Sequence, residues 1–135
     1  MTVVIDASVV VASLIDPGRV GRWAAEVAQG DEVVAPHLLP AEVTSVLRRH
    51  VLKGHISAEV GALTISRLGI LASTIEFHPF GPLQSRVWEL RNSLTAYDAW
   101  YVATAEFLHL PLATLDQRLV RAHGPRCPFL TPPEG

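Results

Sequence analysis

The sequence predicts an α/β fold: a three-layer α/β/α sandwich with a central, mostly parallel sheet. Short apolar segments rich in β-branched residues alternate with longer helical segments along the whole chain, which is the pattern of βαβ units. The strand-like segments are mostly continuous apolar runs, as expected for strands that are buried on both faces. The length of 135 residues fits a single domain, 1–135.

The elements follow from local signals. A β-branched run ends at Asp6 and predicts the first strand, Gly30 ends the second helix, and Pro40 and Gly54 bound a long third helix. Alternation in the segment 73–80 predicts another strand. The predicted strands are 2–6, 32–36, 73–80, 111–115 and 127–131. The predicted helices are 7–16, 17–30, 40–54, 57–71, 81–94, 95–110 and 116–123.

Composition narrows the class of protein. A net charge of −2 and a pI of about 6.3 are not the strongly basic balance typical of nucleic-acid-binding domains. The basic run 48–55 is interpreted as the solvated face of a helix rather than as a phosphate-binding face. Cys127 is the only cysteine, which excludes an internal disulfide and a thiolate zinc cluster. With no apolar run of about 18 residues and no signal-peptide pattern, we expect a cytoplasmic protein without a membrane partner.

Four acidic residues fall at equivalent places in these elements. Asp6 ends the first strand and Asp116 directly follows the strand 111–115, while Glu42 and Asp98 each lie in the first turn of a helix. In an open parallel sheet, strand C-termini and helix N-termini share one edge, and ligands bind there. The sequence therefore predicts that the four carboxylates meet at this edge.

Each acid also has a local explanation. The segment from Thr95 to Asp98 fits a capping box, Asp6 and Asp116 fit N-caps, and Glu42 complements a helix dipole. These explanations predict no common environment for the four acids. Clustered carboxylates repel one another and need a cation, and hard oxygen ligands favour Mg²⁺ or Mn²⁺. Such a site suits metal-assisted hydrolysis of phosphodiesters.

Other phosphoryl-transfer sites fit poorly. A haloacid-dehalogenase-type phosphatase needs an aspartate two positions after the first, where this chain has Ser8. A receiver domain needs a lysine on a late strand, and the only lysine, Lys53, lies on a predicted helix. No Gly-rich phosphate loop follows any predicted strand.

The segments "VVIDASVVVASL", "LPAEVTSVLRR" and "TAYDAWYVATAEFLHLPLATLD" together resemble the PIN-domain nucleases, specifically the VapC-type toxins of bacterial toxin–antitoxin operons. The resemblance implies an endoribonuclease with Mg²⁺ or Mn²⁺ as cofactor, and maps the catalytic and metal-binding acids of the family onto Asp6, Glu42, Asp98 and Asp116. It also implies an RNA substrate, a cognate antitoxin protein and a homodimer.

Further residues are candidates for supporting roles. Ser8 and Thr114 match positions where the family often keeps a small hydroxyl residue near the metal, and their alternative role is turn or strand propensity. Ser45 stands where the family often has asparagine, a departure that concerns the surroundings of the metal. Arg118 and Arg121 closely follow Asp116 and are candidates for binding substrate phosphates, with plain solvent exposure as the alternative.

Two rival functions remain open at this point. One is a catalytically inactive PIN-like module that binds RNA or protein, and the other is a metal-dependent phosphomonoesterase. The helical spacing of Trp88 and Trp100 predicts burial rather than base stacking. No histidine shows ligand spacing to another, so all six are expected to be structural or on the surface.

Overall fold

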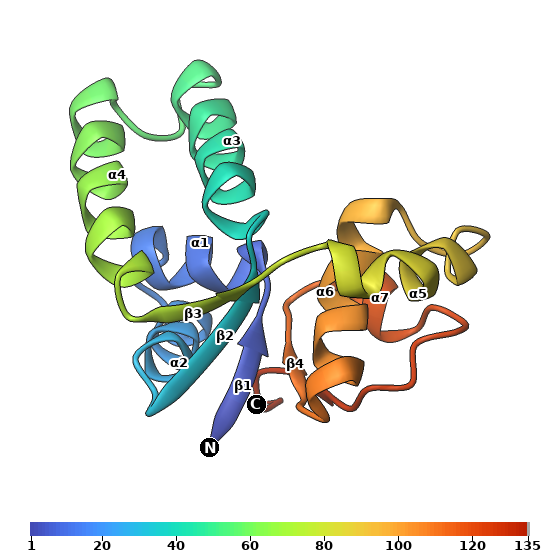
Figure 1. Cartoon of the computed structure of the whole chain (residues 1–135). Coiled ribbons are helices and arrows are strands. Elements are labelled where there is room, and N and C mark those ends of the chain that lie inside the picture. The colour runs from blue at the N-terminus through green and yellow to red at the C-terminus, as the bar shows by residue number, and fades with distance from the viewer. Residues whose placement is uncertain (135) are drawn as a thin grey trace.

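The computed structural model describes residues 1–134 and contains a five-stranded sheet in which all neighbouring strands are parallel (Figure 1). The strand order is β3-β2-β1-β4-β5. The strands are β1 (Thr2–Ile5), β2 (Glu32–Pro36), β3 (Ile75–His78), β4 (Leu112–Ala113) and β5 (Phe129–Leu130). The predicted fold class is confirmed.

Helices cover both faces of the sheet. Figure 1 shows α1 and α2 on one side and α5 and α6 on the other, while α3 and α4 form a hairpin that projects from the body. The helices are α1 (Ala7–Ile15), α2 (Arg19–Ala28), α3 (Leu39–Leu52), α4 (Ala58–Ala72), α5 (Gln84–Glu89), α6 (Ala96–Leu108) and α7 (Gln117–Val120), with a 3₁₀ turn η1 (Gly81–Leu83) before α5. Among the helices of residues 1–134, none combines the length and apolar character needed to cross a bilayer.

The core lies on both faces of β1, the central strand. Val4, Ile5 and Leu112 are fully buried. Helix α6 packs against β1, β2 and β4, and small residues such as Ala99 and Ala103 on its buried face let its backbone approach the sheet closely. On the other face, α1 crosses α2 where Gly21 has no side chain. A Cβ there would lie 1.8 Å from the Asp16 carbonyl oxygen.

One predicted helix is shorter and more divided than expected. The segment 81–94 forms η1 and the six-residue α5, and ends in turns. The amide of Leu90 is shared between the carbonyls of Arg86 and Val87, which tightens the last turn. Asn92 and Ser93, which favour turns over helix, follow it.

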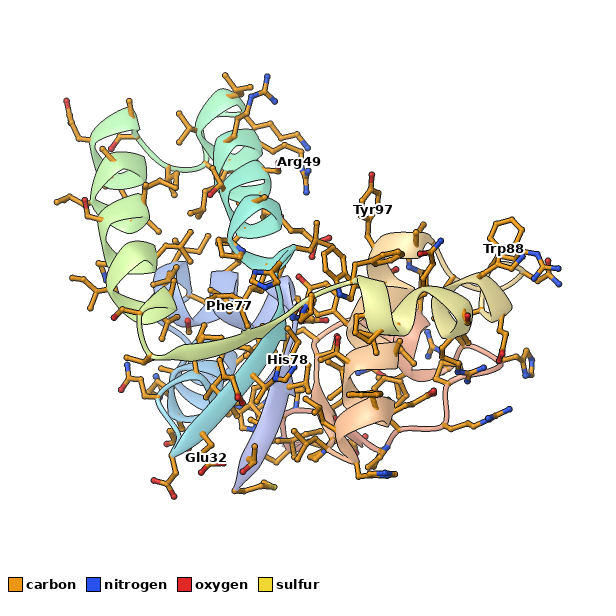
Figure 2. The ribbon with its side chains drawn as sticks, in the orientation of Figure 1. Glu32, Arg49, Phe77, His78, Trp88 and Tyr97 are labelled. Atoms are coloured by element: carbon orange, nitrogen blue, oxygen red, sulfur yellow. The ribbon has the colours of Figure 1, made fainter. Side chains whose placement is uncertain are left out.

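The prediction that Trp88 is buried is wrong. The short α5 buries Val87 against the core, so the adjacent Trp88 points to solvent with 66% of its surface exposed (Figure 2). The Arg91 guanidinium lies over its ring at 4.7 Å from the centroid. Trp100 is half-buried and meets Phe80 edge-to-face.

Candidate active site

The site lies where the winding of the sheet reverses, at the carboxyl ends of β1 and β4. Chain connections leave these neighbouring strands towards opposite edges of the sheet, so a crevice opens between them. Asp6 directly follows β1, and Asp116 lies three residues after the end of β4. This edge of the sheet is where the sequence places the four acids.

Asp6 is held from both sides by hydroxyl groups. Its Oδ1 accepts hydrogen bonds from Ser8 Oγ (2.5 Å) and from the Val9 amide (3.2 Å), and its Oδ2 accepts one from Thr114 Oγ1. Ser8 Oγ in turn accepts a hydrogen bond from the Leu115 amide at 3.0 Å. Two hydroxyl groups from distant parts of the chain therefore fix the orientation of this carboxylate.

Glu42 lies in the first turn of α3 and faces α6. Its Oε1 accepts a hydrogen bond of 2.7 Å from the hydroxyl of Tyr101, a residue only 1% exposed. Tyr101 comes three residues after Asp98, so both lie on one side of α6. The buried tyrosine thus holds Glu42 from the side of α6 that also carries Asp98.

The remaining two acids begin helices. Asp116 is the N-cap of α7, where its Oδ1 accepts from the amides of Arg118 (2.9 Å) and Leu119 (3.4 Å). Asp98 lies in the first turn of α6, and its amide donates to Thr95 Oγ1 at 3.2 Å. The N-cap explanation is therefore confirmed for Asp116. For α6 only the Thr95 half of the predicted capping box is present among the described residues. Capping of these helices coexists with the shared location of the acids.

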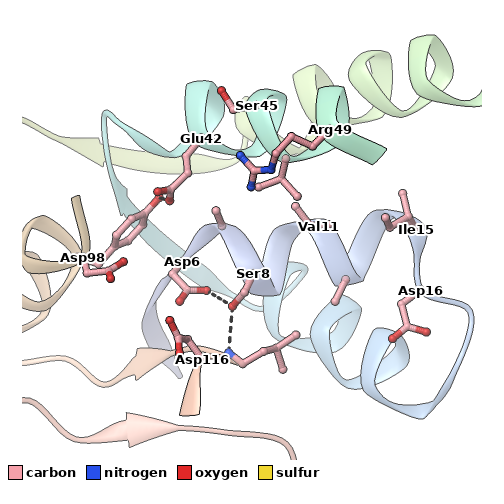
Figure 3. Close-up of a pocket in the computed structure, with 15 residues that line it drawn as sticks. Asp6, Ser8, Val11, Ile15, Asp16, Glu42, Ser45, Arg49, Asp98 and Asp116 are labelled. Atoms are coloured by element: carbon pink, nitrogen blue, oxygen red, sulfur yellow. Dashed lines mark hydrogen bonds between the residues drawn. The ribbon is translucent and has the colours of Figure 1, made fainter. Parts of the chain in front are cut away.

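All four acids line one pocket of about 510 Å³. Figure 3 shows Asp6, Glu42, Asp98 and Asp116 around one end of it, with Val11 and Ile15 of α1 towards the other end. Ser8, Ser45, Arg49 and Tyr101 also line the pocket. The predicted convergence of the acids is thus present in the fold.

The carboxylates influence one another in a chain. Burial raises the pKa of Asp6 from 3.8 to about 6, against the hydrogen bonds from Ser8, Thr114 and Val9, and the charge of Glu42 adds to the rise. Burial also raises the pKa of Glu42 and that of Asp98, and the neighbouring charges of Asp98 and Asp116, respectively, act in the same direction. Such mutual repulsion is what a bound cation would relieve.

The oxygens suit a hard divalent cation, although they are not yet gathered around one point. In residues 1–134, no three acidic, histidine or cysteine side chains form a set that could hold an ion as they stand. Asp6 Oδ2 accepts a single hydrogen bond, which leaves it one lone pair. Glu42 Oε2 and Asp116 Oδ2 accept none from the described part of the protein. These oxygens line the same pocket, and carboxylate oxygens are the kind of donor that Mg²⁺ and Mn²⁺ prefer.

The other predicted residues differ in how they lie relative to the pocket. Ser8 and Thr114 donate hydrogen bonds to Asp6. Ser45 lines the pocket but makes no hydrogen bond to an acid among the described residues. Arg118 and Arg121 are exposed and lie outside the pocket lining, and Arg118 Nε is 3.8 Å from Asp116 Oδ1.

Arg49 and Tyr101 line the pocket together with the predicted acids, and neither was predicted from the sequence. Both could have been found from helical spacing. Tyr101 follows Asp98 by three positions, and Arg49 follows Glu42 by seven, so each shares a helix face with an acid. The basic run 48–55 was interpreted as a single solvated face, and this interpretation missed that Arg49 lies on the same side of the helix as Glu42.

Comparisons with known proteins agree with the fold and with the resemblance. A family model described as PIN domain matches residues 3–125. Ribonuclease VapC9 of Mycobacterium tuberculosis is 35% identical over 131 residues, which are 97% of this chain and 98% of that protein. Ribonuclease VapC1 of the same organism is 39% identical over 125 residues, 92% of each chain. The solved structure of VapBC2 from Rickettsia felis bound to a promoter DNA fragment is 16% identical, with a TM-score of 0.70, covering 97% of this chain and 98% of that chain.

Proposed function

The chain belongs to the PIN-domain family and, within it, to the VapC ribonucleases, and from that membership we propose that it is a metal-dependent endoribonuclease that acts as a toxin. The observation that carries the proposal is the convergence of Asp6, Glu42, Asp98 and Asp116 on one pocket at the carboxyl edge of the sheet. A module that only bound RNA would gain nothing from four carboxylates that repel one another and the phosphates of the RNA.

In the proposed mechanism, Asp6, Glu42, Asp98 and Asp116 would hold Mg²⁺ or Mn²⁺. When bound, the cation would supply Lewis-acid chemistry that lowers the pKa of water and offsets negative charge at the phosphate. Ser8 and Thr114 hold Asp6 in place, and Tyr101 does the same for Glu42. The amides at the start of α7 hold Asp116. The protein thus fixes the carboxylates before the substrate binds.

Substrate and partner follow from the same proposal. Arg118 and Arg121, exposed beside Asp116, are proposed to bind phosphates of the RNA. By analogy with the VapBC complex that shares the fold, a cognate antitoxin protein binds the toxin. The projecting hairpin offers apolar surface to a protein partner, since Leu52, Leu63 and Ile70 are each more than 60% exposed. A homodimer and a cytoplasmic location remain predictions, which light scattering and cell fractionation test.

Cleavage of structured RNA in Mg²⁺ or Mn²⁺ is the direct test, with chelator and an Asp98→Asn variant as controls. We expect cuts that need both the metal and Asp98, and growth arrest on expression that the variant does not cause. If the wild type cuts no RNA with either metal, or the variant cuts equally well, the proposal is wrong. Turnover of a small phosphate monoester without RNA cleavage would instead indicate a phosphomonoesterase.

A further inference from the structure

Arg49 is the one basic side chain in the lining of the acidic pocket. It lies on α3, two turns after Glu42, and its positive charge acts on that carboxylate. Figure 3 shows its guanidinium extending from α3 over the pocket, towards the end that holds the acids. A cation thus lies on the wall of a pocket whose other charged groups are acidic.

The N–H groups of the Arg49 guanidinium are free to donate hydrogen bonds. Within residues 1–134, no carboxylate oxygen lies within the 4.0 Å of an ion pair with Arg49, and its side chain donates no hydrogen bond. In contrast, five other arginines donate from their side chains to the protein itself. These are Arg19, Arg22, Arg67, Arg86 and Arg91. Arg49 therefore keeps a planar set of donors free for an incoming anion.

A second arginine lies across the acids. Arg118 on α7 acts on the charge of Asp98 and lies 3.8 Å from Asp116. Figure 3 shows Arg49 and Glu42 on one side of Asp6 and Asp116 on the other. Arg49 and Glu42 belong to α3, and Arg118 belongs to α7, the helix that Asp116 caps. The acid cluster is thus flanked by a guanidinium group on each side.

We propose that Arg49 binds a phosphate of the RNA backbone next to the phosphate that is cut, so that the strand crosses the acids from α3 to α7. The inference rests on the proposed ribonuclease function and adds a residue and a direction for the strand. A repeating backbone of phosphates matches cations on both sides of a metal site. The pocket lining includes the apolar residues Val11, Ile15 and Val46 and also the polar residues Ser45 and Asp16. Because backbone phosphates are the same at every base, a phosphate contact by Arg49 contributes affinity rather than sequence choice.

A purely structural role predicts different behaviour. If Arg49 only offsets the charge of the acids, its removal makes the pocket more negative and strengthens Mn²⁺ binding, with no specific loss of RNA affinity. If Arg49 binds phosphate, its removal weakens RNA binding at every sequence. Metal affinity and RNA affinity therefore separate the two roles.

The chain offers a matched control in Arg48. This exposed neighbour has the same charge and lies on the same helix, but it lines the groove between α3 and α4 instead of the acidic pocket. Arg49→Ala and Arg48→Ala are compared in the non-cutting Asp98→Asn background, with short single-stranded RNAs of several sequences at a series of salt concentrations. Arg49→Lys is added, because lysine keeps the charge and loses the bidentate fork.

We expect Arg49→Ala to weaken binding of each RNA by about tenfold or more, which corresponds to the loss of a charge-assisted hydrogen bond. The slope of log affinity against log salt should fall by about 0.7 for one lost phosphate contact. Arg48→Ala should change affinity less than threefold, with Arg49→Lys between the two. The inference is overturned if Arg48→Ala and Arg49→Ala have equal effects on RNA affinity, or if Arg49→Ala binds Mn²⁺ more tightly without losing RNA affinity. In either case the ribonuclease proposal still holds as long as the wild type cuts RNA. A wild type that cuts no RNA would overturn both.

Discussion

Replacing Asp6 by asparagine should make the metal-free protein less sensitive to pH. Burial raises the pKa of Asp6 from 3.8 to about 6 in the folded protein. Between these values the folded state binds a proton that the unfolded state has released, so stability falls as pH rises through this window. The asparagine variant has no such proton, and any cost of its amide among the donors Ser8, Val9 and Thr114 is the same at each pH.

The size of the effect follows from the shift. A difference of roughly two pKa units corresponds to about 3 kcal/mol of stability lost on full ionisation of Asp6. About half of it, on the order of 1 to 2 kcal/mol, falls between about pH 5 and about pH 7.5. Relative to the wild type, Asp6→Asn should therefore gain stability of that order over the interval.

Urea denaturation in the presence of chelator at the two pH values measures this difference. Asp31→Asn is the matched control, since the Asp31 side chain is 94% exposed. Adding Mn²⁺ at the higher pH should stabilise the wild type by about 2.7 kcal/mol at a hundredfold excess over the dissociation constant, and the Asp6 variant much less. If the stability difference between the wild type and Asp6→Asn is the same at both pH values, burial of a charged Asp6 is not the dominant cost.

Three further substitutions test other parts of the structure. Tyr101→Phe removes the buried hydroxyl that donates to Glu42, and we expect a roughly tenfold lower kcat with little change in KM. The control Tyr97→Phe, at a position 61% exposed, should have no effect. Equal rates for the two variants would show that the Tyr101 hydroxyl does not position Glu42. Gly21→Ala places a Cβ 1.8 Å from a backbone oxygen and should lower the free energy of unfolding by about 3 kcal/mol. Gly69→Ala, with open space around it, should raise this free energy by about 0.5–1 kcal/mol, so similar values for both glycines in urea denaturation would contradict the close crossing. Glu106→Ala removes the carboxylate that accepts two hydrogen bonds from the Arg86 guanidinium and one from the Arg126 amide. We expect the free energy of unfolding to fall by about 2 kcal/mol and the loop 121–128 to be cut earlier by a protease. An unchanged proteolysis pattern would refute the role of this network.

The order of the elements and the position of the acids could be predicted from the sequence because both depend on local signals. Most strands are short apolar runs, and several helices have their own start signal, such as Thr95 before α6 or Asp116 before α7. Parallel pairing then brings the ends of β1 and β4 together. The edge on which Asp6 and Asp116 meet follows from topology rather than from any detail of packing.

What the sequence did not predict depends on which way a side chain turns. Trp88 and Val87 are neighbours on a six-residue helix, and only the packing of that short helix decides which one is buried. The rings of His50 and His55 approach to 3.2 Å between their Nδ1 atoms. They do so because Gly54, at φ +75°, reverses the chain after α3, a contact that residue spacing alone does not indicate.

The central place of β1 in the sheet also concerns the synthesis of the protein. β1 is made first, but Thr114, which holds Asp6, follows 108 residues later. A growing chain on the ribosome carries three of the acids before the neighbouring strand β4 and Asp116 exist. The proposed RNA-cutting site therefore forms only when β4 has emerged and paired with β1. An unfinished chain that lacks β4 and Asp116 therefore carries an incomplete site for as long as these residues have not been added.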